Sequence, residues 1–368
     1  MQNLKNKPKN FQRLTNCCAQ SGKPGLRFLF YLTLILLLVQ VPVQAQSISR
    51  VGTTAAPFLK IGVGGRALGM GEAYTTQAED VTGLFWNPGG LARIEKIQIL
   101  LNHYDYLAGL YYEFGAIAIP FPQIGTFGFF LSYLGMPEIE RTTIQFPDGN
   151  GEKVSANSFA AGISFARALT DRFSIGGSAK YIRETIWHSQ AAGIAFDIGL
   201  LYRTFFKNLK IGMSISNFGS DLQMSGRDML IQHDIAPNTM FAGNNENINA
   251  HLDTDQFPLP ILFRAGLSAN LAKDFFNLSQ YDWIVAVDAF HPNDNREYLN
   301  VGTEVLLYDL LALRTGYRQV FLDEREGGLC YGFGLHFHVR QSDLYLDYAS
   351  VDFGRLDRQN KFSLIFSF

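Results

Sequence analysis

Histidine and cysteine are the side chains of this sequence that most readily do chemistry, so their spacing comes first. His336 and His338 alternate with Phe337, and a strand would place both rings on one face together with Cys330. Cys330 and His336 would lie roughly 20 Å apart on that strand, at about 3.3 Å per residue. The sequence contains neither a nucleophile–base–acid order nor a metal-ligand spacing. We therefore expect no enzymatic activity, no metal and no cofactor, and interpret these side chains as the lining of a polar interior.

A glycine-rich segment offers a second pattern with chemical meaning. Gly62-x-Gly64-x-x-Ala67 has the spacing of a dinucleotide-binding fingerprint, with Asp80 near the offset of its ribose-binding acid. No strand–helix–strand pattern surrounds it, so we expect no nucleotide site. Glycines instead let a backbone bend tightly and approach a wall closely. We interpret residues 46–96 as a plug threaded into a larger structure. The residues expected to shape this plug are Gly62, Gly64, Gly65, Arg66, Gly69, Gly71, Asp80, Asn87, Pro88 and Gly89.

Charged residues of the plug segment are expected to pair with charges on the wall of that structure. The plug charges are Lys60, Arg66, Glu72, Glu79 and Asp80. The expected wall charges are Asp197, Arg203, Arg264, Asp288, Glu304, Arg314, Arg318 and Asp347. Asp80 to Ala92 is expected to hold a short helix that ends at Asn87-Pro88-Gly89.

The first 45 residues are typical of a secretory signal. They carry basic residues but no acid, followed by the apolar run Phe28 to Val39. Val43-Gln44-Ala45 supplies a small-residue cleavage pattern. The apolar run is shorter than the roughly 20 residues that a membrane-spanning helix needs. We therefore expect export and cleavage after Ala45.

Composition excludes several classes of protein. Charged residues make up 17% of the 368 residues, and the chain holds 31 Phe, 16 Tyr and 35 Gly. Abundant aromatic residues with little charge exclude a disordered chain, and abundant glycine disfavours a helical bundle. A formal net charge of −2 with no basic stripe gives no reason to expect nucleic acid as a partner.

Period-two alternation recurs from about residue 97 to the C-terminus and predicts strands. Most of the predicted strands are as long as a tilted strand that crosses a bilayer, which needs roughly 9–11 residues. The fourteen predicted strands are 97–104, 109–119, 125–134, 156–166, 172–183, 191–203, 208–216, 261–271, 281–290, 298–307, 311–318, 328–339, 343–350 and 361–368.

The alternation and the loop lengths favour a membrane barrel over a soluble sandwich. In 328–339, Leu329, Tyr331 and Phe333 oppose Gly332 and Gly334. Alternation alone also fits a sandwich with its apolar face inward. The connections alternate between short turns and longer loops, above all 135–155 and 217–260, which is the pattern of bacterial outer-membrane barrels.

The last strand resembles the C-terminal signal by which outer-membrane barrels are recognised by their assembly machinery. Phe362, Leu364, Phe366 and Phe368 share one face of it. We therefore predict an all-β fold, a fourteen-stranded antiparallel transmembrane β-barrel with an N-terminal lumenal plug. Residues 1–45 are the expected signal peptide, 46–96 the plug and 97–368 the barrel, placed in the lipid of the bacterial outer membrane.

Two segments carry a resemblance to a known family. FLKIGVGGRALGMGEAYT and AEDVTGLFWNPGGLA are similar to the N-terminal motifs of the PorV/PorQ family, within the wider FadL-like fourteen-strand barrels. Family members more often have Ala at the position of Gly90. The resemblance implies a non-enzymatic component of the type IX secretion system that binds the translocon or secreted cargo.

Loop 217–260 is the expected contact element for a partner or ligand. Its candidate contact residues are Met224, Met229, Ile231, Met240 and Phe241. The alternative is that they fold back over the barrel mouth as a lid. The wider FadL-like resemblance implies a second role, the uptake of hydrophobic molecules such as long-chain fatty acids. For that role, Gly125, Gly128 and Gly135 are expected to mark a kink where strand pairing breaks and a molecule leaves sideways.

Overall fold

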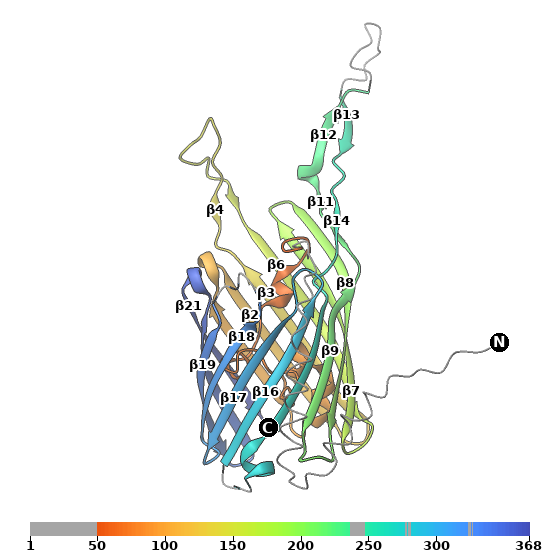
Figure 1. Cartoon of the computed structure of the whole chain (residues 1–368). Helices are drawn as coiled ribbons and strands as arrows, with labels where there is room; N and C mark the ends of the chain where they lie inside the picture. The colour runs from red at the N-terminus through yellow and green to blue at the C-terminus, as the bar shows by residue number, and fades with distance from the viewer. Residues whose placement is uncertain (1–49, 236–246, 277, 279–280, 323–324, 326) are drawn as a thin grey trace, which may run out of the picture. The chain divides into compact units, whose positions relative to one another are not determined.

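The computed structural model describes residues 50–235, 247–276, 278, 281–322, 325 and 327–368 (Figure 1). The expected signal peptide 1–45 lies outside these residues, as do Met240 and Phe241. Within the described ranges, no helix is long and apolar enough to cross a membrane.

Fourteen strands of the described chain form one closed antiparallel sheet. Each strand pairs with its neighbours, and β1 pairs with β21 from Gln98↔Ser367 to His103↔Phe362 to complete the circle. All fourteen predicted strands are confirmed, with ends shifted by a few residues. The strands are β1 (Gln98–Asp105), β2 (Tyr111–Phe121), β3 (Gly125–Gly135), β6 (Ala156–Ala168), β7 (Phe173–Ile186), β8 (Ser189–Arg203), β9 (Lys210–Gly219), β15 (Leu262–Asn270), β16 (Tyr281–Pro292), β17 (Tyr298–Leu307), β18 (Leu311–Val320), β19 (Leu329–Val339), β20 (Ser342–Asp352) and β21 (Arg358–Ser367).

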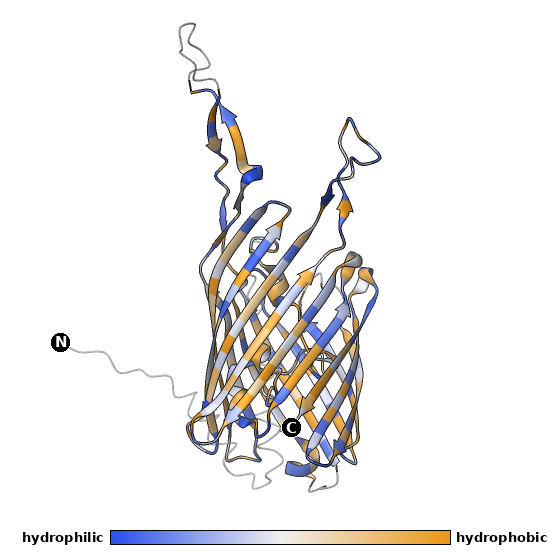
Figure 2. Cartoon of the chain, turned by 180° about the vertical axis from the view of Figure 1, so that it is seen from behind, coloured by the Kyte–Doolittle hydropathy of each residue, from blue (hydrophilic) through white to orange (hydrophobic). Residues whose placement is uncertain are grey.

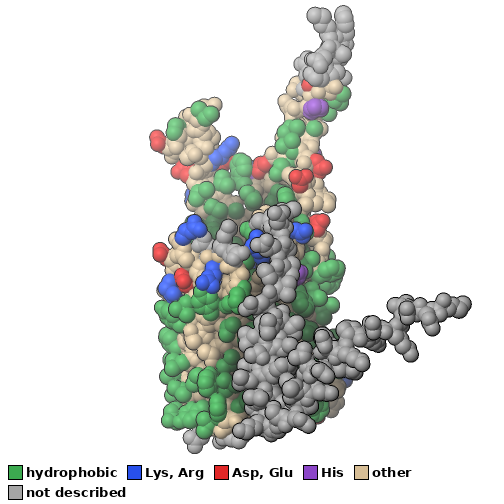
Figure 3. All heavy atoms as spheres, in the orientation of Figure 1, with side chains coloured by type: hydrophobic (Ala, Val, Ile, Leu, Met, Phe, Trp, Pro, Cys, Tyr) green, Lys and Arg blue, Asp and Glu red, His purple; other side chains and the backbone are tan. Residues whose placement is uncertain are grey.

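Apolar side chains point out of the barrel and polar ones point into it. On β3, Phe127, Phe129 and Leu131 are 47%, 42% and 42% exposed, whereas Thr126 and Ser132 are buried. The same inversion repeats on other strands of the wall, and hydrophobic side chains gather on the visible part of the lower barrel in Figure 3, whereas charged ones lie higher (see also Figure 2). A closed sheet satisfies every backbone group without water, which is what a hydrocarbon environment requires.

The two ends of the barrel differ. Short turns join the strands at the end where the C-terminus lies, and one of them holds the helical turn η5 (Leu271–Phe275). The opposite end carries the short helices η3 (Leu107–Gly109) and η6 (Gly354–Leu356) and two long hairpins that extend beyond the rim (Figure 1). The first hairpin contains β4 (Ile139–Glu140) and β5 (Lys153–Val154). The second contains β10 (Leu222–Gln223), β11 (Ser225–Gly226), η4 (Arg227–Met229), β12 (Leu230–His233), β13 (Ile248–His251) and β14 (Gln256–Phe257).

The predicted break in β3 is wrong. β3 pairs with β2 along its whole length, from Phe121↔Gly125 to Tyr111↔Gly135. It also pairs with β6 from Thr126↔Ala166 to Gly135↔Asn157. The glycines of β3 therefore leave no gap in the ladder for a sideways exit.

The expected assembly residues lie on the strand that closes the barrel. Phe362 and Phe368 are each 55% exposed, and the Phe366 and Phe368 rings stack with centroids 6.5 Å apart. Leu364 faces outward beside Leu101 of β1. Their role in assembly stays a prediction.

Replacing Phe129 by lysine tests which face of the wall meets lipid. A charge near the middle of the lipid-facing belt should destabilise the barrel by about 2–4 kcal/mol. Reversible denaturant unfolding in lipid vesicles measures this loss. Phe146→Lys is the matched control, because Phe146 is 56% exposed in the hairpin beyond the rim. Equal stabilities of the two variants would contradict the assigned orientation.

Candidate functional site

Residues 55–94 lie inside the barrel and are called the internal segment here (orange in Figure 1). The segment contains four short helices, η1 (Pro57–Lys60), α3 (Gly65–Gly69), α4 (Gly83–Trp86) and η2 (Pro88–Arg93). Four of its large apolar side chains, Phe58, Leu68, Tyr74 and Trp86, are at most 1% exposed. Phe58, Tyr74 and Trp86 form one core with inward-facing side chains of the wall, including Tyr112 and Phe114 of β2. Leu68 packs in a second cluster against β19 and β20.

A buried carboxylate joins the internal segment to the wall. The Arg66 guanidinium donates from Nη2 to Glu304 Oε1 at 2.7 Å and from Nε to Oε2 at 2.9 Å. Arg314 donates to the same Glu304 Oε2 at 2.6 Å and to Asp347 Oδ1 at 2.6 Å. The Glu304 side chain is 4% exposed and that of Arg314 is fully buried. Glu304 therefore bridges one cation of the segment and one of the wall.

Asp80 supports this bridge from within the segment. Its carboxylate lies 3.7 Å from Arg66 Nη1 and accepts a hydrogen bond from the Tyr74 hydroxyl at 2.8 Å. It also accepts from the Thr82 backbone N–H at 2.9 Å. Asp80 thus fixes the position of the arginine that reaches Glu304.

Further ion pairs hold the segment at other points of the wall. Glu79 pairs with Arg203 of β8 at 2.5 Å and with Lys210 of β9. Glu72 lies 3.2 Å from Arg318 of β18. Lys60 pairs with Asp294 in the loop after β16. The attachments therefore spread around the circumference. Lys210 and Asp294 are partners that the sequence did not indicate.

Two of the wall charges expected to pair with charges of the segment have other contacts. Asp197 pairs with Lys180 of the neighbouring strand at 2.8 Å. The Arg264 guanidinium packs over the aromatic rings of Phe85, Trp86 and Phe290, with distances to the ring centroids of 5.6, 5.3 and 5.7 Å. The cavity beside Lys180 and Arg264 has a volume of about 20 Å³, enough for a water molecule but not for an acyl chain.

Backbone groups of the segment bind the wall directly before α3. The carbonyl of Gly62 accepts from the Tyr104 hydroxyl at 2.5 Å. The Gly64 N–H donates to Asn102 Oδ1 at 3.3 Å, and the Gly65 N–H donates to Ser363 Oγ at 2.7 Å. These bonds join the predicted glycines to β1 and β21, the two strands that close the barrel.

Asn87 organises the other half of the segment. It ends α4 and precedes Pro88, where η2 begins, close to the expected stop. Its Nδ2 donates to the carbonyls of Thr75 at 2.8 Å and Leu200 at 3.0 Å, and its Oδ1 accepts from Gly89 N–H. One amide therefore ties two turns of the segment to β8.

Facing glycines let the segment touch the wall backbone to backbone. Gly71 has a φ of +63°, and a Cβ there would lie 2.8 Å from the Tyr317 nitrogen. A Cβ on Gly316 of β18 would lie 2.3 Å from the Met70 carbonyl carbon. Gly69 sits between Arg314 and Gly332 in the same region. A Cβ on Gly90 would lie 1.8 Å from the Ala78 carbonyl oxygen, so alanine does not fit this conformation.

The expected contact residues of the outer hairpins occupy different environments. Met224 packs against the core, and Met229 is half-buried. Ile231 is 37% exposed. Hydrophobic side chains that are 40–63% exposed accompany it on the hairpin: Leu230, Ile235, Ile248, Leu252 and Phe257.

The turn between β7 and β8 contacts both long hairpins. The Arg141 guanidinium lies over the Trp187 ring at 5.0 Å, and His188 Nδ1 lies 3.0 Å from Asp228 Oδ1. Arg141 also donates to Glu152 at 2.7 Å and holds the pKa of that carboxyl below its ordinary value. The turn between β7 and β8 therefore contacts the lower part of both hairpins.

The histidines and the cysteine first considered for chemistry are dispersed. Cys330 is buried in the lumen wall, and His336 packs edge-on against Tyr345. His338 Nδ1 lies 2.8 Å from Asp343 Oδ1 near the short turns. Across the described residues, no group of three or more His, Cys, Asp or Glu side chains is arranged to hold a metal ion.

Substituting Glu304 by alanine is predicted to loosen the internal segment. It leaves Arg66 and Arg314 facing each other without their shared carboxylate, at a cost of about 3–5 kcal/mol for a broken buried pair. We expect a lower unfolding temperature and a raised conductance in planar lipid bilayers. Glu138→Ala, which removes an exposed ion pair with Lys153, should leave both unchanged. Wild-type conductance and stability of Glu304→Ala would show that the bridge does not hold the segment.

The solved structures that this chain resembles include two toluene transporters and a FadL homologue. The toluene transporter TodX of Pseudomonas putida has a TM-score of 0.49 at 13% identity, and the toluene transporter TbuX of Ralstonia pickettii 0.49 at 12%. A FadL homologue of Pseudomonas aeruginosa has 0.47 at 13%. Each alignment covers 83% of this chain and 97% of the other. These scores lie below 0.5, so the fold rests on the strand pairing itself.

Comparison with curated protein sequences finds no match. A family model described as type IX secretion system protein PorV matches residues 44–243, which is more than half of the chain. The match includes the two segments on which the resemblance was based and confirms it. A barrel of this family is an outer-membrane protein. The chain therefore belongs to the PorV family.

Proposed function

We propose that this protein is a non-enzymatic docking component of the type IX secretion system in the outer membrane. On this proposal it binds the translocon or secreted cargo through the hairpins beyond its rim. The observation that carries the proposal is that a barrel with a filled interior bears exposed apolar side chains on long hairpins. Family membership adds the system in which such a surface would work.

The filled interior supports docking because the internal segment occupies the lumen that a transport route would need. A fourteen-stranded barrel is wider than its own inward side chains can fill. The internal segment occupies that space and makes ion pairs with β8, β9, β17 and β18. We infer that it acts as a plug, a static filling that stabilises the wall on which the hairpins stand.

The hairpins support docking because their apolar side chains lie beyond the lipid-facing belt. In the first hairpin Ile139, Ile144 and Phe146 are 54%, 99% and 56% exposed. In the second, β12 and β13 pair with each other from Leu230↔His251 to His233↔Ile248, and with no other strand of the described residues. Exposed apolar clusters that neither lipid nor the barrel covers are typical of protein interaction surfaces. The unpaired strand edges add backbone donors and acceptors for an extended partner segment.

Uptake of hydrophobic molecules is the alternative function. It needs a passage through the lumen, and the cavity beside Lys180 and Arg264 holds only about 20 Å³. It also needs a lateral exit, whereas β3 pairs continuously with both neighbours. Uptake would therefore require a rearrangement of the internal segment, and docking requires none.

Placing a charge on the second hairpin is predicted to abolish partner recovery. The Ile231→Asp, Ile248→Asp double variant removes two exposed apolar side chains and adds two charges. We expect native-membrane pull-down of the variant to lose the translocon or cargo proteins that the wild type recovers, by about tenfold or more if each site contributes about 1 kcal/mol.

The matched control is Gln232→Asp, Asn249→Asp, which adds the same charges at the register pair beside it. This control should retain its protein partners. Recovery of bound hydrophobic small molecules without any protein partner, in the wild type as well, would instead favour uptake. Equal recovery of partners by both double variants would remove the second hairpin from the interface.

A further inference from the structure

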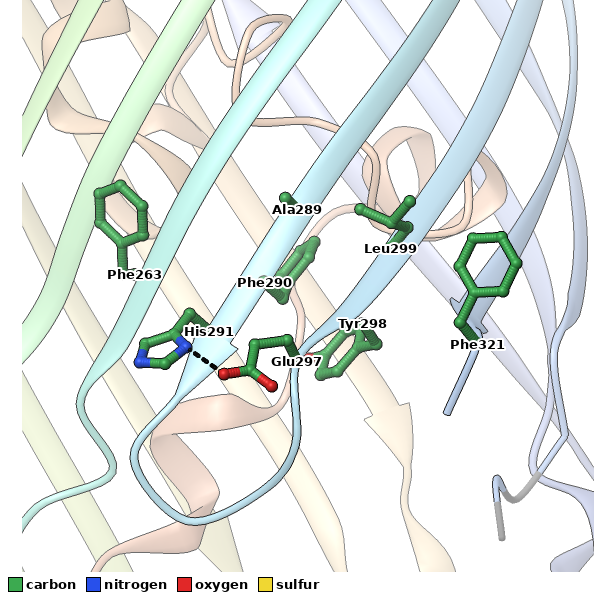
Figure 4. A pocket seen from close by; sticks show the side chains of 8 residues that line it. All are labelled: Phe263, Ala289, Phe290, His291, Glu297, Tyr298, Leu299 and Phe321. Atoms are coloured by element: carbon green, nitrogen blue, oxygen red, sulfur yellow. Dashed lines mark ion pairs between the residues drawn. The ribbon is translucent and has the colours of Figure 1, made fainter. Parts of the chain in front are cut away.

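Two pairs of histidine and glutamate lie on the outside of the barrel near the rim that carries the hairpins. His291 at the end of β16 has its Nδ1 2.9 Å from Glu297 Oε1 in the following loop (Figure 4). His103 of β1 has its Nδ1 2.6 Å from Glu113 Oε1 of β2. Both pairs are largely exposed, with side-chain exposures of 64% and 70% in the first and 63% and 47% in the second.

An apolar groove begins beside each pair and runs along the lipid-facing wall. The groove beside His291 has a volume of about 310 Å³, and Figure 4 shows Phe263, Ala289, Leu299 and Phe321 along it. The groove beside His103 has a volume of about 720 Å³. Its apolar lining includes Leu101, Leu131, Leu346, Phe362 and Leu364.

A small residue forms the floor of each groove. It lies two positions along the strand from one member of the histidine–glutamate pair. On β16 it is Ala289, two positions from His291, with Leu299 beside it on β17 and Phe263 of β15 beside His291. On β2 it is Gly115, two positions from Glu113 and beside Leu101 and Leu131. A Cβ on Gly115 would meet nothing within 4 Å. The same arrangement therefore occurs twice, on separate hairpins.

Both pairs lie where the apolar belt ends. Below Glu113 the outward residues of β2 are Gly115, Ile117, Ile119 and Phe121, and above it only Tyr111 remains in the strand. His291 is the last outward residue of β16. The edge of the apolar belt is the level of lipid headgroups. A molecule that fills a groove and reaches the pair must therefore be apolar at one end and polar at the other.

The charge at the polar end favours an ammonium group. Each ion pair uses Oε1 of the carboxylate, and the glutamate side chains remain about half exposed or more. The backbone N–H of Glu297 and the nearby His291 lower the pKa of the Glu297 carboxyl, so this group stays ionised. Beside Glu113, the Tyr111 and Tyr133 rings lie 5.9 Å apart and offer aromatic faces to a cation.

A third groove on the same wall lacks this polar end. It has a volume of about 840 Å³ and runs past Phe129, Ile163 and Phe196 over the small residues Gly177 and Ala179. Its lining, taken from the described residues, contains no histidine or glutamate, and its carboxylate Asp197 is buried against Lys180. It provides an internal comparison, a groove for acyl chains without a headgroup site.

We propose that the grooves beside His103–Glu113 and His291–Glu297 bind a membrane lipid whose headgroup carries a primary amine. One acyl chain lies over Gly115 or Ala289, and the ammonium group binds the glutamate carboxylate. The proposal concerns the lipid-facing wall and is independent of the docking function of the hairpins.

The test uses the full chain in nanodiscs made from equal amounts of phosphatidylethanolamine and phosphatidylglycerol. The lipids that stay bound after transfer to mild detergent are quantified by mass spectrometry. We expect the wild type to retain phosphatidylethanolamine preferentially. Glu113→Gln with Glu297→Gln should lower that preference about twofold to fivefold, the range for a partly exposed ion pair. Gly115→Phe with Ala289→Phe should reduce the amount of phosphatidylethanolamine retained.

Two controls separate headgroup recognition from general lipid binding. Glu138→Gln changes a carboxylate in the first hairpin, outside the grooves, and should behave like wild type. Gly177→Phe fills the third groove and should lower total lipid without changing the ratio of the two lipids. Equal retention of both lipids by the wild type, or a preference that survives both pairs of substitutions, would overturn the proposal.

Discussion

The interior of this barrel depends on Glu304, a carboxylate shared by two guanidinium groups. Arg66 reaches it from the internal segment and Arg314 from the neighbouring strand, while Asp347 neutralises the far side of Arg314. In a buried site the attraction between such charges is strong, and so is the penalty for leaving one unpaired. The bridge therefore couples the position of the segment to the integrity of β17, β18 and β20.

The backbone contacts and the ion pairs of the segment together allow it to fill the lumen. A lumen of this width has to be filled, and a filling made only of apolar side chains would leave the wall charges without partners. Glycines such as Gly71 and Gly316 remove side chains where the segment meets the wall. The segment can then lie close enough for Glu72 to reach Arg318 and for Glu79 to reach Arg203.

The strands were predictable from sequence because a bilayer imposes alternation on every residue of the wall. Ion pairs across the lumen were harder to predict from sequence. Lys60 and Asp294, for example, are brought together by the path of a segment that has no periodicity. The glycines of β3 show why a residue type alone misleads. A Cβ on Gly128 would lie 2.4 Å from Leu84 of the internal segment. The glycine there leaves space for Leu84 inside the barrel, and the ladder on both sides stays intact.

The attachments of the internal segment bear on the choice between docking and uptake. A ligand shifts a conformational equilibrium only by the difference between its affinities for the two states. Breaking the Glu304 bridge alone costs about 3–5 kcal/mol, and a shift from 1:99 to 99:1 needs about 5.5 kcal/mol of differential affinity. An uncharged apolar solute has no charge to offer Arg66 or Glu304 in exchange for their lost partners. A fatty acid could offer its one carboxylate to Arg66 but has no cation for Glu304. A protein that binds the hairpins leaves every one of these pairs in place, and for this reason the docking function fits the interior as well as the surface.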